Sequence, residues 1–317
     1  MVAVHPGSVA SHIDRVLAHS IGHAAAVYGY PMVEMLRLCR LQTCSRVDPP
    51  DDPRAPMGVF FRWAGPSGGA GAPRALRPCA AAWLYLGDEP CRLPRPAAAP
   101  SGPRLLRLYD GYAENFACLR LDTGAAAATV LIGPRAPLPA LAEGEQVLRA
   151  RTRLVWVHYH AADAQPAMPG LRTPSAPSAR AWRPPAVDLW AGGPHDALRT
   201  IADDRAAAPA LAPAYFVNLC QALAQTPGLP QDEGLRQQFR RAGLCPGPME
   251  AWHALPAVTR RGLADGLADA AQCVRNAAHS QPDGAATRLR PYVLRAARAA
   301  RGIGMPEDPE TLPTHAA

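Results

Sequence analysis

Apolar residues near the N-terminus recur at helical spacing and predict one amphipathic helix over residues 8–28. Pro31 is expected to end this helix, because proline removes a backbone donor, and a second helix is expected over 32–42. The apolar stripe of the first helix consists of Ile13, Leu17, Ile21, Ala24 and Tyr28.

The pattern changes between residues 58 and 160, where short apolar runs alternate with breaks rich in glycine and proline. Runs of this length bounded by turn residues are typical of strands. The runs are Val59–Trp63, Ala80–Leu86, Leu105–Tyr109, Thr129–Ile132 and Leu154–His160. We therefore predict a first domain over 1–165, with helices followed by a β-rich part shaped like a sandwich or barrel.

The last half of the chain returns to helical spacing after a stretch rich in proline and alanine. Residues 166–212 are expected to form a linker, and 213–305 a helical region whose clearest stripes lie over 256–278 and 286–301. Residues 306–317 are expected to form a flexible tail. The predicted fold class is α+β, with helices at both ends of the chain.

Composition changes this picture little. All 33 basic residues are arginine and the formal charge is +7, but the arginines are dispersed, which favours a solvated surface and not nucleic-acid binding. The 8 cysteines form no C-x-x-C pair. No run of 18 apolar residues and no secretory signal is evident, so we expect no membrane span and a cytoplasmic protein, or a periplasmic one if a leader was removed.

Three histidines lie on one side of the first predicted helix. His12, His19 and His23 are close together at roughly 100° per residue, about 140° from the apolar stripe, so they are expected to face solvent. No glutamate completes an H-E-x-x-H metal motif, and no nucleophile elbow, dinucleotide motif or P-loop is present. We therefore predict neither a metal site nor a cofactor.

Two groups of polar residues remain as candidates for chemistry. His158 and His160 share one strand face with Trp156, where two imidazoles beside an indole could bind an anion or act as acid and base, although a polar strand end is the simpler interpretation. The segment YDGYAENFA carries Asp110, Tyr112, Glu114 and Asn115 just after a strand. Its carboxylates could do acid–base work, but Asp-Gly favours a turn in which Asp110 bonds nearby backbone.

Several short motifs, taken in order, resemble the family catalogued as domain of unknown function 1254, followed by the start of its usual partner, domain 1214. They begin at Tyr28-Gly29-Tyr30-Pro31 and continue through Ala55–Phe60, Ala82-Trp83-Leu84, Asp110–Ala117, Gly133-Pro134, Thr152–Val157 and Tyr292–Ala296. The resemblance covers most of residues 20–305. It implies a β-rich first domain, and a second domain of which only the beginning is present.

Most polar positions of that family are replaced in this chain. Gly58 stands where the family has Asn, Arg62 where it has His, His160 where it has Arg, and Cys79-Ala80-Ala81 where it has Asn, Asp and Thr. Asp110, Asn115 and Arg153 match the family pattern. Removing a hydrogen-bonding partner weakens a polar site by about 1–3 kcal/mol. The resemblance thus implies an eroded polar site.

These observations leave three hypotheses. The first is a protein that binds a small molecule or a protein partner. The second is a weakly active hydrolase for a small apolar or carboxylated compound, and the third is a structural or assembly role, with homo-oligomers forming through the C-terminal helix. The candidate catalytic groups are His158, His160 and Asp110. The candidate ligand-binding residues are Tyr30, Arg62, Tyr112, Asn115, Arg153 and Trp156.

Overall fold

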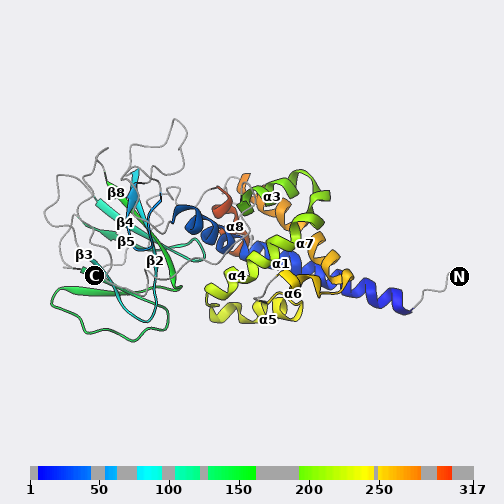
Figure 1. Ribbon diagram of the computed structural model, residues 1–317, viewed down its shortest axis with the longest axis horizontal. Helices are drawn as coiled ribbons and strands as arrows, with labels where there is room; N and C mark the ends of the chain where they lie inside the picture. The colour runs from blue at the N-terminus through cyan, green and yellow to red at the C-terminus, as the bar shows by residue number, and fades with distance from the viewer. Residues whose placement is uncertain are drawn as a thin grey trace. The chain divides into compact units, whose positions relative to one another are not determined.

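The computed structural model describes residues 6–43, 54–62, 77–94, 104–121, 128–161, 193–245, 249–279 and 291–301 (Figure 1). The chain forms two compact units. One, the helical unit, consists of residues 1–37 and 185–303, and the other, the sheet unit, consists of residues 38–184 and 304–317. The N-terminal helix was expected to belong to the same domain as the strands, but its described residues 6–37 belong to the helical unit.

The first helix, α1, is continuous from Pro6 to Gln42 and contains Pro31, so the predicted break at this proline is wrong. A proline inside a helix costs about 3 kcal/mol because it removes one hydrogen bond and crowds the preceding turn. Residues 25–36 are buried without interruption. Burying a large aliphatic or aromatic side chain contributes about 1.5–3 kcal/mol, so packing around this segment outweighs the penalty.

The predicted apolar stripe of α1 is buried only in part. Ile21 is 9% exposed, whereas Ile13 and Leu17 are both 59% exposed. The periodicity correctly predicted a helix there, but it did not predict how far along the helix the packing extends.

The described residues of the sheet unit form eight strands in two sheets. The strands are β1 (Phe61–Arg62), β2 (Arg77–Tyr85), β3 (Cys91–Pro94), β4 (Arg104–Asp110), β5 (Asn115–Arg120), β6 (Ala128–Ile132), β7 (Glu145–Arg149) and β8 (Leu154–Ala161). The larger sheet has the order β1-β2-β8-β4-β5 and is antiparallel throughout. The smaller has the order β3-β6-β7, with β6 and β7 parallel.

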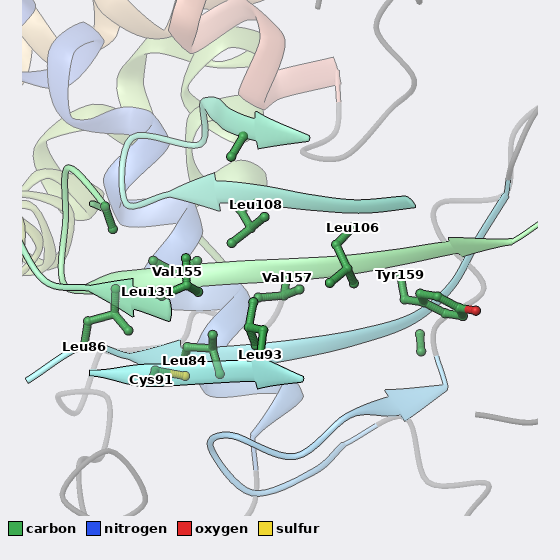
Figure 2. Close-up of a cluster of buried hydrophobic side chains, with 13 residues drawn as sticks. Leu84, Leu86, Cys91, Leu93, Leu106, Leu108, Leu131, Val155, Val157 and Tyr159 are labelled. Carbon is green, nitrogen blue, oxygen red and sulfur yellow. The ribbon is translucent and has the colours of Figure 1, made fainter. Parts of the chain in front are cut away.

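A hydrophobic core is shared by the two sheets (Figure 2). The larger sheet contributes alternate residues of β8, namely Val155, Val157 and Tyr159, and the smaller contributes Cys91 and Leu93. Alternation of side chains along a strand explains why these β8 residues point to one side. The fold is therefore a small sandwich within an α+β chain, as the pattern predicted, although β3, β5 and β7 were not predicted.

The helical unit is completed by residues that the sequence suggested were a linker. Besides α1, the described elements of this unit are α3 (Gly193–Asp203), η1 (Arg205–Ala207), α4 (Ala208–Gln225), η2 (Pro230–Asp232), α5 (Glu233–Arg241), α6 (Met249–His253), α7 (Ala257–His279) and α8 (Pro291–Arg301). Residues 193–212 are thus largely helical, while 162–192 and the expected tail 306–317 lie outside the described residues.

One helical stretch, Arg205–Gln225, is long and apolar enough to cross a membrane by length and composition, but half of its most apolar window is buried within the protein.

Helices α1 and α7 pack at very short distance, and glycines make this possible. A Cβ atom built on Gly266 would lie 2.2 Å from the His19 carbonyl oxygen, and one on Gly262 would lie 2.5 Å from the Arg15 carbonyl oxygen. From the other helix, a Cβ on Gly22 would lie 2.7 Å from a backbone oxygen of α7. Only hydrogen fits at these positions, so the glycines set the spacing of the two helices.

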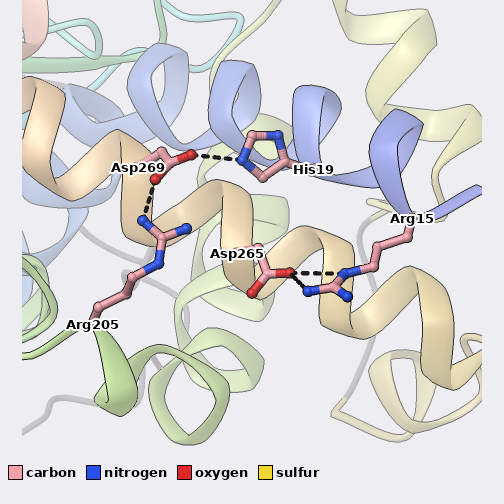
Figure 3. A network of polar contacts seen from close by, with 5 residues as sticks. All are labelled: Arg15, His19, Arg205, Asp265 and Asp269. Atoms are coloured by element: carbon pink, nitrogen blue, oxygen red, sulfur yellow. Dashed lines mark hydrogen bonds and ion pairs between the residues drawn. The ribbon is translucent and has the colours of Figure 1, made fainter. Parts of the chain in front are cut away.

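Charged side chains flank the same helix pair (Figure 3). Arg15 donates two hydrogen bonds to Asp265, at 2.7 and 3.1 Å. His19 Nε2 lies 2.7 Å from Asp269 Oδ2, and Arg205 also pairs with Asp269. His19 therefore faces α7 and not open solvent as the helical count suggested. No group of three or more metal-ligating side chains occurs among the described residues.

The C-terminal helix α8 is anchored within the same unit. The buried carboxylate of Asp232 accepts hydrogen bonds from Tyr28 at 3.1 Å and Tyr292 at 2.9 Å. Val293 is 9% exposed and Ala296 is fully buried. The apolar side of α8 is thus largely covered within the chain, and the expected homo-oligomer through this helix stays a prediction.

Candidate functional site

The face of the larger sheet opposite the sandwich core is also buried. Alternation along β8 places Trp156, His158 and His160 there, at 1%, 0% and 3% exposure. We call this side the basic face and define it by Trp83 of β2, Arg107 and Tyr109 of β4, and Trp156, His158 and His160 of β8. The sequence correctly placed the three β8 residues on one face, but it suggested a strand end at a rim, and the structure places them in the interior.

Aromatic rings pack closely around His158. Trp83 and Trp156 stack with centroids 4.9 Å apart, and the Trp156 ring meets that of His158 edge-on at 4.0 Å. The Tyr109 ring lies 4.7 Å from the His158 ring and 6.4 Å from that of Trp156, so the three rings form one cluster. The Trp83 indole donates a 2.8 Å hydrogen bond to the Gln42 side chain, at the end of α1. These contacts hold the His158 ring in one orientation.

Arg107 is the one charged side chain buried within the basic face as described. It lies directly opposite His158 in the β4–β8 register and is 8% exposed. Its Nε atom is buried and has no hydrogen-bond partner among the described residues. Across β8, the register partner of His158 on β2 is Ala81, whose methyl group leaves the imidazole flanked by a small side chain on one side and a guanidinium on the other.

The electrostatics of this face disfavour further positive charge. Burial lowers the pKa of His158 well below 6.5, and the neighbouring His160 and Arg107 lower it further. The centroids of the two imidazole rings are 6.1 Å apart. His158 is therefore neutral at pH 7, and a bound anion would be the partner that favours its protonation.

Asp110 lies at the end of β4 and holds a tight turn. Its Oδ1 accepts hydrogen bonds from the backbone N–H groups of Tyr112 at 2.9 Å and Glu114 at 3.1 Å, and its Oδ2 lies 2.5 Å from Arg151. Burial raises the pKa of Asp110 to about 6, although Arg151 and the two N–H donors oppose this shift. Its Oδ1 thus holds the turn, the role that the Asp-Gly sequence favoured, while its Oδ2 forms an ion pair with Arg151.

The structure does not bring the three candidate catalytic groups together. Asp110 pairs with Val155 in the β4–β8 register, whereas His160 pairs with Leu105, five residues further along. At about 3.4 Å per residue, Asp110 and His160 are roughly 17 Å apart. A general acid and a general base acting on one bond need to be within hydrogen-bond reach of the substrate, so this set has no hydrolase geometry.

The remaining predicted ligand-binding residues are dispersed. Tyr112 is fully buried beside the Asp110 turn, and Asn115 begins β5. Arg153 is largely exposed, 3.9 Å from Asp88, and Arg62 is exposed at the end of the short β1. Tyr30 belongs to the helical unit, where it lines a cavity with α3 and α7. None of these four side chains on the sheet unit belongs to the basic face as defined.

Sequence reasoning missed Arg107, Tyr109 and Trp83 as members of one site. A signal was present, because an arginine interrupts the otherwise apolar run Leu105–Tyr109 at a position that alternation places with Tyr109. The pairing that places Arg107 opposite His158 joins residues 51 positions apart, so a short stretch of sequence does not predict it.

No protein family and no curated protein matches the chain. Among solved structures, the chain is similar to the crystal structure of the VPA0106 protein from Vibrio parahaemolyticus, with a TM-score of 0.57 and 13% sequence identity. The likeness covers 91% of this chain and 68% of that one. At this identity, it shows a shared α+β fold and nothing about function.

Proposed function

We propose that the protein binds a small organic anion at the basic face and does not turn it over. The main observation that supports this proposal is the buried side chain of Arg107, whose Nε has no hydrogen-bond partner among the described residues. Charged groups are rarely buried unless a partner of opposite charge compensates them. A carboxylate or phosphate would supply that charge and accept the hydrogen bond.

The composition of the face supports an anion over a cation. The described strand residues on this side include Arg107 and two histidines but no aspartate or glutamate. The indoles of Trp83 and Trp156, which stack on each other and are both 1% exposed, make the surroundings of this face apolar and aromatic. A compact carboxylate with an aromatic or planar body matches both features, and benzoate and phenylacetate are the simplest probes.

A binding role is favoured over hydrolysis because Asp110 is engaged in its turn and lies roughly 17 Å from His160 by strand spacing. The resemblance to domain 1254 and the cytoplasmic location stay predictions that are compatible with this role. In the resembling family an Asn stands at the position of Gly58, whose φ is +79°. Asparagine and glycine are the residues that adopt this conformation most readily, so backbone geometry explains that exchange without invoking a lost ligand.

The test is isothermal titration of the full chain with benzoate, phenylacetate and inorganic phosphate at pH 7 and fixed salt, repeated with Arg107→Gln. We expect the variant to lose at least tenfold in affinity, because a hydrogen bond to a charged group contributes about 1.5–3 kcal/mol. Arg62→Gln is the matched control, since Arg62 is exposed and pairs with Ala80, whose neighbours form the sandwich core.

A second measurement separates binding from folding. The ring resonances of His158 and His160 report local charge, so a bound anion should raise the apparent pKa of His158 in an NMR titration. Arg107→Lys keeps the charge if the glutamine variant fails to fold. Unchanged resonances together with equal affinity in wild type and Arg107 variants would refute the proposal.

A further inference from the structure

The helical unit contains a cavity of about 460 Å³ that the basic face does not use. This volume lies within the usual range of small-molecule sites, roughly 300–1,000 Å³. Its walls come from four helices, with small side chains where the helices approach one another. The apolar lining residues are Leu198, Ala202, Ala271, Val274, Ala278 and Ala300.

Tyr30 closes the cavity on the side of α1 and is 1% exposed. It stands in the Tyr28-Gly29-Tyr30-Pro31 stretch, which the structure places inside the continuous helix. Tyr28 of the same stretch bonds Asp232 and has a packing role. Tyr30 therefore differs from its neighbour in facing a space that a ligand could occupy.

The polar residues among the described lining of the cavity come from α3 and α7 and are predominantly basic. Asp203 and Arg275 form an ion pair at 2.6 Å and so neutralise each other. His279 Nδ1 lies 2.7 Å from the Arg275 carbonyl oxygen, and because a carbonyl can only accept, Nδ1 must carry the proton. Arg199 is exposed and makes no ion pair with another described residue, so the described lining carries one positive charge in excess at this side chain.

We propose that this cavity binds an unbranched aliphatic carboxylate of medium length, with its chain among the alanines and its carboxylate toward Arg199. Four of the lining residues are alanines, which offer aliphatic surface without the bulk of larger side chains. Among the described lining residues, Tyr30 supplies the one six-membered aromatic ring, so an alkyl chain fits the chemistry of the wall better than a planar ring system. The carboxylate would compensate Arg199, as guanidinium groups bind carboxylates with paired hydrogen bonds.

The experiment is isothermal titration of the full chain with octanoate and with octan-1-ol, which share a chain and differ in charge. We expect wild type to bind octanoate more tightly than octanol, and Arg199→Gln to lower octanoate affinity about tenfold while octanol affinity stays within twofold. Arg261→Gln is the charge control, because Arg261 is exposed on α7 and does not line the cavity.

Filling variants test the location of the chain. Ala202→Leu and Ala278→Leu replace partly exposed lining residues and should abolish binding of both compounds, whereas Ala224→Leu, exposed on α4 outside the cavity, should not. Two variants are used so that loss of folding in one leaves the other informative. Circular dichroism identifies the folded proteins.

Three outcomes would overturn the proposal: no heat with either compound, octanoate affinity unchanged in Arg199→Gln, or octanoate binding that survives both filling variants. Arg107→Gln should leave octanoate binding unchanged, since Arg107 belongs to the sheet unit. Failure of benzoate to bind at the basic face and failure of octanoate to bind here are therefore separate results.

Discussion

The contact between α1 and α7 predicts that adding one methyl group at Gly266 destabilises the helical unit. A Cβ at this position would lie 2.2 Å from the His19 carbonyl oxygen and 2.6 Å from the His23 backbone nitrogen. Ordinary contact requires at least 3.4 Å, so the helices would have to separate by about 1 Å. Because the obstructing atoms belong to the backbone, no side-chain rotation can relieve the clash.

Two opposing effects set the magnitude of Gly266→Ala. Alanine is favoured over glycine inside a helix by about 0.8–1 kcal/mol. Overpacking a buried contact costs about 1–3 kcal/mol, and the upper end applies where backbone meets backbone. We therefore expect the free energy of unfolding to fall by about 1–2 kcal/mol, in spite of the better helix propensity.

Gly234→Ala is the matched control, because a Cβ there has nothing within 4 Å and the residue is an exposed position of α5. It should raise the free energy of unfolding by up to about 1 kcal/mol. Urea denaturation followed by circular dichroism measures both variants. If Gly266→Ala stabilises the protein as much as Gly234→Ala does, the close packing of α1 on α7 is wrong.

Three further predictions concern the sheet unit. Because the pKa of His158 is lowered in the folded state, the unfolded chain binds the extra proton first as the pH falls. The free energy of unfolding should therefore fall below pH 6.5, by at most about 1.4 kcal/mol per pH unit. In a series of urea denaturations at different pH, His158→Phe should remove this component. Asp110→Ala should lower the free energy of unfolding at pH 7 by about 2–4 kcal/mol, because two N–H groups and Arg151 lose their acceptor. Asp110→Asn keeps Oδ1 and should lose less than half as much. Equal losses for the two variants in thermal unfolding would contradict this account. Ala113 has φ +61°, so Ala113→Gly should raise the melting temperature, by relief of about 0.5–1 kcal/mol of backbone strain, and a lower one would count against it.

Local pattern predicted the strands best where both faces are buried. Two of the predicted runs, Leu154–His160 and Leu105–Tyr109, correspond to β8 and β4, which lie next to each other in the larger sheet. Strand β7 was missed because Glu145 and Arg149 make it polar, and its place is set by parallel pairing with β6. Pairing with a distant strand stabilises such a segment, and a short window does not contain that information.

Only the part of the candidate site that lies on β8 was predicted from the sequence. Alternation correctly grouped Trp156, His158 and His160, because period two follows from strand geometry alone. It could not show that Asp110 lies at the far end of the neighbouring strand, since this depends on register. The same limit explains Pro31, where burial of the surrounding helix overrides a strong local signal.

The helical unit is assembled from two segments, residues 1–37 and 185–303, and the described strands of the sheet unit are encoded between them. The ion pairs of α1 with α7 join residues 250 positions apart. At a synthesis rate of about 5–20 residues per second, roughly 10–50 s pass between the emergence of these two helices from a ribosome. During that interval the apolar surface of α1 has no α7 to pack against. The order of synthesis therefore exposes a long helix to chaperones and to aggregation, while the described strands of the sheet unit, which all lie between residues 61 and 161, can fold first.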